Sequence, residues 1–132
     1  MPPLLLIHPV GVGLSSRFWD RFILRWKEDD PETVLLAPDL IGCGKAECSS
    51  NPLTPDDWAR PLVNVLRNCN EGPAVLVAQG TTLPIALALL EKAPELVCGI
   101  VSISPPSWRL LNETFPVERS KQLWRWLFKG PI

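Results

Sequence analysis

The sequence lacks any run of lysine or arginine residues, and its formal net charge is only -1 over 132 residues. Proteins that hold nucleic acid by its phosphates carry a basic patch or stripe. The charge pattern therefore predicts that nucleic acid is not a partner. Internal repeats and low-complexity tracts are missing as well, and 46% of the residues are hydrophobic. We therefore expect the chain to fold around a core as one domain.

Histidine is scarce, and the cysteines are scattered. The chain has one histidine, His8, and four cysteines at positions 43, 48, 69 and 98, with no Cys-x-x-Cys pair among them. Metal sites need clustered ligands, so the pattern predicts no metal site, and nothing in the sequence points to a cofactor. Scattered cysteines indicate free thiols in a reducing compartment, which favours a cytoplasmic location.

A long hydrophobic run is also missing. The N-terminal stretch PPLLLIHPVG is apolar, but it is much shorter than the ~20 residues that a membrane span needs. No basic segment precedes it, as one would in a signal peptide. The sequence therefore predicts neither a spanning helix nor a secreted protein.

Four short apolar segments predict β-strands at residues 4–8, 33–38, 74–79 and 98–104. Their apolar residues are continuous rather than alternating, which is typical of strands covered on both faces. Strands of this kind occur in parallel sheets, where helices lie on the two sides.

The segments between these strands favour helices. Residues 17–26 predict a short polar helix, and residues 83–92 are apolar nearly all round, as in a helix buried against a sheet. Between them, Thr54 can cap a helix that has Pro55 in its first turn, and Asp57 can complete a capping box. The alternation of strands and helices predicts an α/β fold with a parallel, doubly wound sheet of about four strands.

The last part of the chain differs from the rest. Residues 123, 124, 127 and 128 form an apolar stripe at helical spacing, with basic residues opposite. Such a stripe is typical of a face that packs on a core or forms part of a lid. A helix that lies on a membrane surface or docks on a partner is the alternative.

Four stretches of the chain, taken in order, resemble the N-terminal half of an α/β-hydrolase: LLLIHPVGVG, LLAPDLIGCGKAE, VLVAQGTTLPIALALLEKAPELV and GIVSISPP. That family has an oxyanion loop after one strand and a Pro-Asp-x-x-Gly-x-Gly turn after the next. Gly-x-Ser-x-Gly then follows at a strand–helix elbow. The resemblance implies a partial hydrolase core at residues 1–106 and the start of a lid at 107–132, with a lid-like helix. It also implies that the four strands lie in the order second, first, third, fourth.

The elbow departs from the family pattern. The stretch AQGTT at 78–82 falls on Gly-x-Ser-x-Gly, so Gly80 occupies the nucleophile position without a side chain. The family's catalytic acid and histidine have no counterpart in this sequence. We expect residue 80 to keep the positive φ of the elbow, which glycine tolerates well. Since Pro84 suits only the first turn of a helix, we expect the helix to begin near Thr81 or Thr82, with a threonine hydroxyl as its cap.

The resemblance also implies roles for other residues. The backbone N–H groups of Val10 and Thr81 would form an oxyanion hole around Gly80, able to bind an anion or the carbonyl of a small apolar, ester-like ligand. Structural roles are implied for His8, Asp39, Gly42 and Gly44, with Asp39 bonding nearby backbone N–H groups.

Three functions remain open. The first is a relative of esterases and other hydrolases of small apolar substrates that is inactive as this chain, because nucleophile, acid and base are lacking. The second is a non-catalytic pseudo-hydrolase that binds a ligand near Val10, Gly80 and Thr81. The third is an interaction module that docks on a protein or membrane. The chain would end at the start of the lid, as a fragment or half of a split protein, and its exposed sheet edges would favour self-association.

Overall fold

The computed structural model describes residues 1–105. The expected lid segment, 107–132, and the apolar stripe within it lie outside the described residues. In the described part, four parallel strands form one sheet: β1 (Leu4–Ile7), β2 (Leu35–Leu36), β3 (Ala74–Gln79) and β4 (Val97–Ile103). Their order in the sheet is β2-β1-β3-β4, which confirms the predicted order.

Strand β2 is shorter than predicted. Of the apolar segment 33–38, only Leu35–Leu36 pairs with β1 as strand. At one flank, the Thr33 N–H donates to the carboxylate of Asp30 instead of a neighbouring strand. At the other flank, Pro38 has no N–H to donate. The apolar pattern therefore extends beyond the assigned strand, although the Val34 carbonyl still accepts a hydrogen bond from the Leu4 N–H at 2.9 Å.

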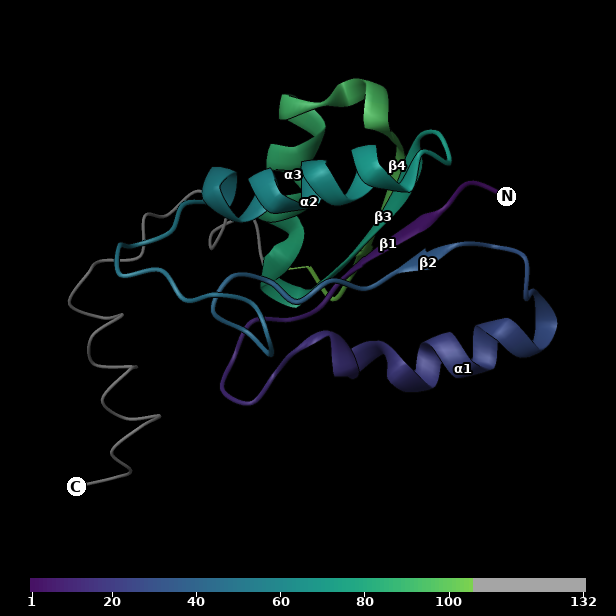
Figure 1. Ribbon diagram of the computed structural model, residues 1–132, viewed down its shortest axis with the longest axis horizontal. Coiled ribbons are helices and arrows are strands. Elements are labelled where there is room, and N and C mark those ends of the chain that lie inside the picture. Colours follow the sequence, from purple (N-terminus) through teal and green to yellow (C-terminus); the bar gives the residue numbers. More distant parts are fainter. Residues whose placement is uncertain (106–132) are drawn as a thin grey trace.

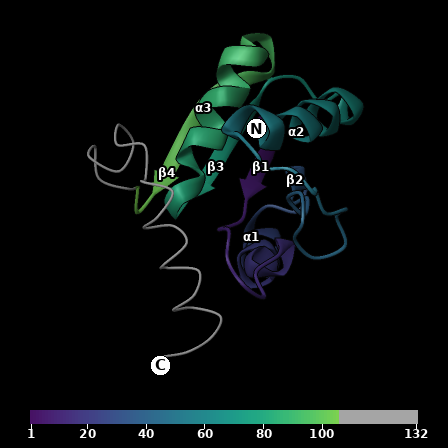
Figure 2. The same ribbon diagram turned by 90° about the vertical axis from the view of Figure 1, so that its left-hand side faces the viewer.

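Helices cover both faces of the sheet, which confirms the doubly wound arrangement. In Figures 1 and 2, α1 (Asp20–Asp29) lies on one side, whereas α2 (Pro55–Cys69) and α3 (Leu83–Lys92) lie together on the other. Short 3-10 turns precede α1, α3 and β4, at Ser16–Trp19, Gly80–Thr82 and Pro94–Leu96.

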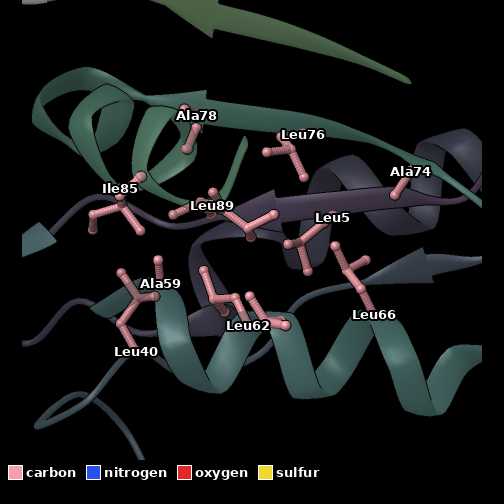
Figure 3. Close-up of a cluster of buried hydrophobic side chains, with 14 of the residues drawn as sticks. Leu5, Leu40, Ala59, Leu62, Leu66, Ala74, Leu76, Ala78, Ile85 and Leu89 are labelled. Carbon is pink, nitrogen blue, oxygen red and sulfur yellow. The ribbon is translucent and has the colours of Figure 1, made fainter. Parts of the chain in front are cut away.

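Strand β1 shows why the apolar segments do not alternate. Leu5 and Ile7 are buried in the core beneath α2 and α3, whereas Leu4 and Leu6 are buried on the α1 side. Figure 3 shows Leu5 of the sheet and Leu62 of α2 directed into the same cluster. Every residue of the strand therefore faces a hydrophobic core, as in a sheet with two covered faces.

The start of α2 is fixed by the predicted capping box. The Asp57 N–H donates to Thr54 Oγ1 at 3.3 Å, and the Thr54 N–H donates to Asp57 Oδ2 at 2.9 Å. These two bonds satisfy backbone donors that have no partner within the helix. With the helix anchored at this point, Leu62 and Leu66 lie buried against the sheet.

Candidate functional site

The carboxyl ends of β1 and β3 bring two turns together. The two strands are parallel neighbours, with Ile7 opposite Ala78. Residues 8–10 and 79–81 therefore leave the sheet at the same edge. In open α/β sheets, ligands bind outside the carboxyl ends of the strands, so this edge is the candidate functional site.

Residue 80 forms the sharp turn between β3 and α3. Gly80 has a φ of 65°, which confirms the expected positive angle. A Cβ built at this residue would meet no atom within 4 Å. The buried strand and helix on either side fix the path of the turn. The elbow therefore keeps the backbone angle and the open space of a side-chain position but carries no side chain there.

Replacing Gly80 with alanine should lower the free energy of unfolding by about 1 kcal/mol, because an L-residue is strained at positive φ although the space is open. The measurement is urea unfolding followed by far-UV circular dichroism. Gly99→Ala is the matched control, since its φ is not in the left-handed region and its Cβ would make an ordinary 3.8 Å contact with Val75. Equal losses in the two variants would contradict a strained elbow.

The two threonines after Gly80 behave differently from the expectation. The Thr82 hydroxyl is buried and donates to the Gln79 carbonyl at 2.8 Å, and it caps no N–H of α3. The predicted threonine cap is therefore wrong. The reason is the 3-10 turn Gly80–Thr82, which gives Thr82 a helical backbone before α3 begins, so that its hydroxyl turns back to the preceding carbonyl. Thr81 is exposed at the surface.

His8 lies fully buried beneath the turn that follows β1. Its Nε2 accepts a hydrogen bond from the Leu40 N–H at 3.0 Å, and its Nδ1 lies 2.8 Å from the Pro9 carbonyl oxygen. An accepting Nε2 places the proton of the neutral ring on Nδ1, where it donates to that carbonyl. Both ring nitrogens are therefore engaged with the backbone, and the ring joins the end of β1 to the turn after β2.

Asp39 fixes the turn after β2. Its carboxylate accepts hydrogen bonds from the Ser16 N–H at 2.8 Å and from the Lys45 N–H at 2.9 Å. These bonds, the one from Lys45 foremost, lower the pKa of the Asp39 carboxyl from its ordinary value of 3.8 to about 2. The carboxylate is therefore charged at neutral pH and links this turn to the loop before α1.

The two glycines of the same turn have different reasons for lacking a side chain. Gly44 has a φ of 54°, and a Cβ on it would overlap the carboxylate of Asp39. Gly42 has a φ of 76°, but a Cβ there would meet nothing within 4 Å. The close approach of Asp39 thus requires glycine at residue 44, whereas only the backbone angle favours it at residue 42.

A cavity of about 750 Å³ opens between the loop after β1 and the turn after β2. Residues 10–15 and 41–44 line it, together with Arg17 and Trp58. Of the three residues expected to share a pocket, Val10 lines this cavity, whereas Gly80 and Thr81 do not. Sequence reasoning missed most of these lining residues, although the Gly-rich stretch VGVG at 10–13 marks a loop whose backbone is open to a ligand.

Among residues 1–105, no group of three histidine, cysteine or acidic side chains is placed to hold a metal ion. All four cysteines are free thiols. Within the same residues, no helix has both the length and the apolar character that crossing a membrane requires.

The sequence matches one protein-family model, described as the alpha/beta hydrolase family, over residues 4–131. The chain belongs to this family. The turn at Gly80, the loop after β1 and the Asp39 turn follow the carboxyl ends of β3, β1 and β2. A search of curated proteins finds no match.

Solved structures share the α/β-hydrolase fold. A thermophilic esterase from Thermogutta terrifontis has a TM-score of 0.72 at 21% identity, over 99% of this chain and 46% of its own. E-2-(Acetamidomethylene)succinate hydrolase has a TM-score of 0.72 at 20% identity, over 99% and 45%. A mutant of the haloalkane dehalogenase DatA from Agrobacterium tumefaciens C58 has a TM-score of 0.63 at 23% identity, over 79% and 34%. The chain spans less than half the length of each.

Proposed function

We propose that this chain is a catalytically silent member of the α/β-hydrolase family that binds a small apolar, ester-like ligand. The observation that carries the proposal is Gly80, which holds the elbow at a φ of 65° with open space but without a nucleophile. Even a longer polypeptide with a catalytic acid and a histidine would not have a hydroxyl at residue 80. Covalent catalysis at the elbow therefore fails in this chain on its own residues.

Among residues 1–105, no neighbouring group replaces the missing serine. The Thr82 hydroxyl is buried and bonded to Gln79. Thr81 is exposed, but a hydroxyl nucleophile needs a base within hydrogen-bond reach. The one histidine of the chain, His8, has both ring nitrogens engaged with the backbone. The elbow thus lacks both parts of an activated nucleophile.

The cavity between the loop after β1 and the turn after β2 supports binding without turnover, although Gly80 and Thr81 do not line it. Apolar side chains from the two loops and from α2 line it, including Leu14, Ile41 and Trp58. Its volume of about 750 Å³ falls in the range of small-molecule sites. A neutral ester such as methyl octanoate should therefore stabilise the folded chain against heat as its concentration rises past Kd.

Purified protein should not hydrolyse p-nitrophenyl acetate above the buffer rate, and a fluorophosphonate probe should not label it. Gly80→Ser should not restore turnover, because the restored hydroxyl would still lack a base. Mass spectrometry of the protein after incubation with the probe is the second measurement. Turnover together with labelling at Thr81, both lost in Thr81→Ala, would contradict the catalytic silence of the chain.

A second candidate function is association through β4. Within residues 1–105, this strand pairs with β3 alone. On its α1 side, Val101 is 48% and Ile103 is 39% exposed. An open apolar strand edge is a template for pairing with another chain, and a second copy of this chain carries the same edge.

Association should appear as a concentration-dependent mass in size-exclusion chromatography with light scattering. Val101→Lys should shift the chain toward the monomer, because a charged side chain at the edge opposes strand addition. Leu24→Lys is the control, since Leu24 is an exposed apolar residue of α1. A monomer at all concentrations in the unsubstituted chain would rule out this candidate.

A further inference from the structure

The cavity between the loop after β1 and the turn after β2 has a polar side that the proposed binding of an ester-like ligand does not use. Several backbone N–H groups of the first loop donate to no atom of residues 1–105: those of Val10, Gly11, Val12, Gly13 and Ser15. Leu14 is the exception in this loop, because its N–H donates to the Gly11 carbonyl. The residues that carry these donors without a partner also line the cavity.

The turn after β2 offers fewer donors. In this turn, the Gly42 N–H donates to the Glu47 carbonyl at 2.8 Å, and the Cys43 N–H donates to the Leu40 carbonyl at 2.8 Å. Ile41 of this turn and Trp58 of α2 add apolar surface to the cavity, as does Leu14 of the first loop. Most of the donors without a partner among residues 1–105 thus lie in the first loop, whereas apolar side chains come from both loops and from α2.

The charge of the cavity has one sign. Arg17 is the only charged residue among the described residues that line it. Its side chain is 88% exposed, and its Nε lies 3.7 Å from the Asp20 carboxylate, a loose pair in water. The nearby Asp39 carboxylate does not line the cavity and is bonded to Ser16 and Lys45. A ligand in the cavity thus meets the positive charge of Arg17, which the exposed Asp20 carboxylate offsets only weakly in water.

We propose that this cavity binds a small amphiphilic carboxylate, with its acid group at Arg17 and the free N–H groups of residues 10–13 and its apolar body against Leu14, Ile41 and Trp58. The inference rests on the proposed binding function and names the class of ligand. A guanidinium with several backbone donors is a strong combination for an oxyanion. Contact with these apolar side chains favours an acid with a hydrocarbon body over a bare anion such as acetate.

The test compares octanoate with methyl octanoate and acetate in calorimetric titrations of the purified chain at neutral pH. Octanoate should bind about tenfold more tightly than methyl octanoate, and acetate should bind far more weakly than either. Arg17→Gln should remove the preference for the acid, measured as the ratio of the octanoate and methyl octanoate affinities in the same variant. Arg21→Gln is the matched control, because Arg21 is an exposed arginine of α1 that does not line the cavity.

The position of the ligand is read from amide chemical shifts in a nitrogen-15 spectrum. Octanoate should move the amides of residues 10–13 and the indole signal of Trp58. Equal affinities for octanoate and methyl octanoate, or a preference that survives Arg17→Gln, would overturn the assignment of a carboxylate while ligand binding itself stands. Failure of both compounds to bind would overturn the carboxylate site and the proposed binding function together.

Discussion

Replacing His8 with phenylalanine should lower the free energy of unfolding by about 2–4 kcal/mol, although an aromatic ring is kept at this position. The loss comes from hydrogen bonding, because the Leu40 N–H donates to His8 Nε2 in a fully buried place. A buried donor that loses its partner costs the full desolvation of that group. The Pro9 carbonyl would also lose its contact with Nδ1. Urea unfolding with an unchanged m-value is the measurement.

His8→Gln is the matched variant. A glutamine side chain places an acceptor oxygen near the position of Nε2, so it should restore the bond from the Leu40 N–H. We therefore expect His8→Gln to lose less than half as much stability as His8→Phe. Similar losses in the two variants would mean that packing of the imidazole ring, and not its bond to the turn after β2, stabilises the site.

The sequence was sufficient to predict the structural features that depend on residues close to one another along the chain. The capping box needs only Thr54 and Asp57, three residues apart, and both of its bonds form. The angle at Gly80 follows from a buried strand and a buried helix joined by too few residues for any other path. The strand order followed from the family resemblance, which rests on the sequence of motifs along the chain.

Contacts between distant residues could not be predicted in the same way. The bond from Leu40 to His8 joins residues 32 positions apart, and the bond from Ser16 to Asp39 joins residues 23 apart. The motif around Asp39 predicted that its carboxylate would bond backbone N–H groups, but the donor from the loop before α1 becomes known only when the two loops meet. The cavity also forms only where these two loops meet. The sequence alone therefore did not indicate that Arg17 lines a cavity.

Thr82 shows how a local rule fails when another local bond competes. Threonine is a good helix cap only where its own backbone is extended. Here the chain turns into a 3-10 helix directly after β3, and the Thr82 hydroxyl finds the Gln79 carbonyl. The same tight turn holds residue 80 at positive φ. The geometry of the elbow therefore determines the hydrogen bonds at the start of α3, and the propensity of threonine to cap a helix does not.

Replacing Gly44 with alanine should lower the free energy of unfolding by about 2–4 kcal/mol at neutral pH. Part of the loss is the strain of an L-residue at a φ of 54°. The larger part arises because the new Cβ overlaps the carboxylate of Asp39. The carboxylate must then move away from the Lys45 and Ser16 N–H groups that bond it. Gly42→Ala is the control, with strain but no overlap, and should lose only about 1 kcal/mol.

The pH dependence separates the two parts of the loss at Gly44. The bonds from Lys45 and Ser16 hold the pKa of Asp39 at about 2, below its ordinary value of 3.8. A depressed carboxyl pKa stabilises the folded state above pH 3.8, and this contribution disappears as the pH falls toward 2. The loss of unfolding free energy in Gly44→Ala should therefore shrink as the pH falls from 3.8 toward 2, until only the backbone strain remains. The loss in Gly42→Ala should stay constant over the same interval. Urea titrations at pH 7, 4 and 2.5 measure both, and a Gly44→Ala loss that does not change with pH would show that Asp39 keeps its bonds in the variant.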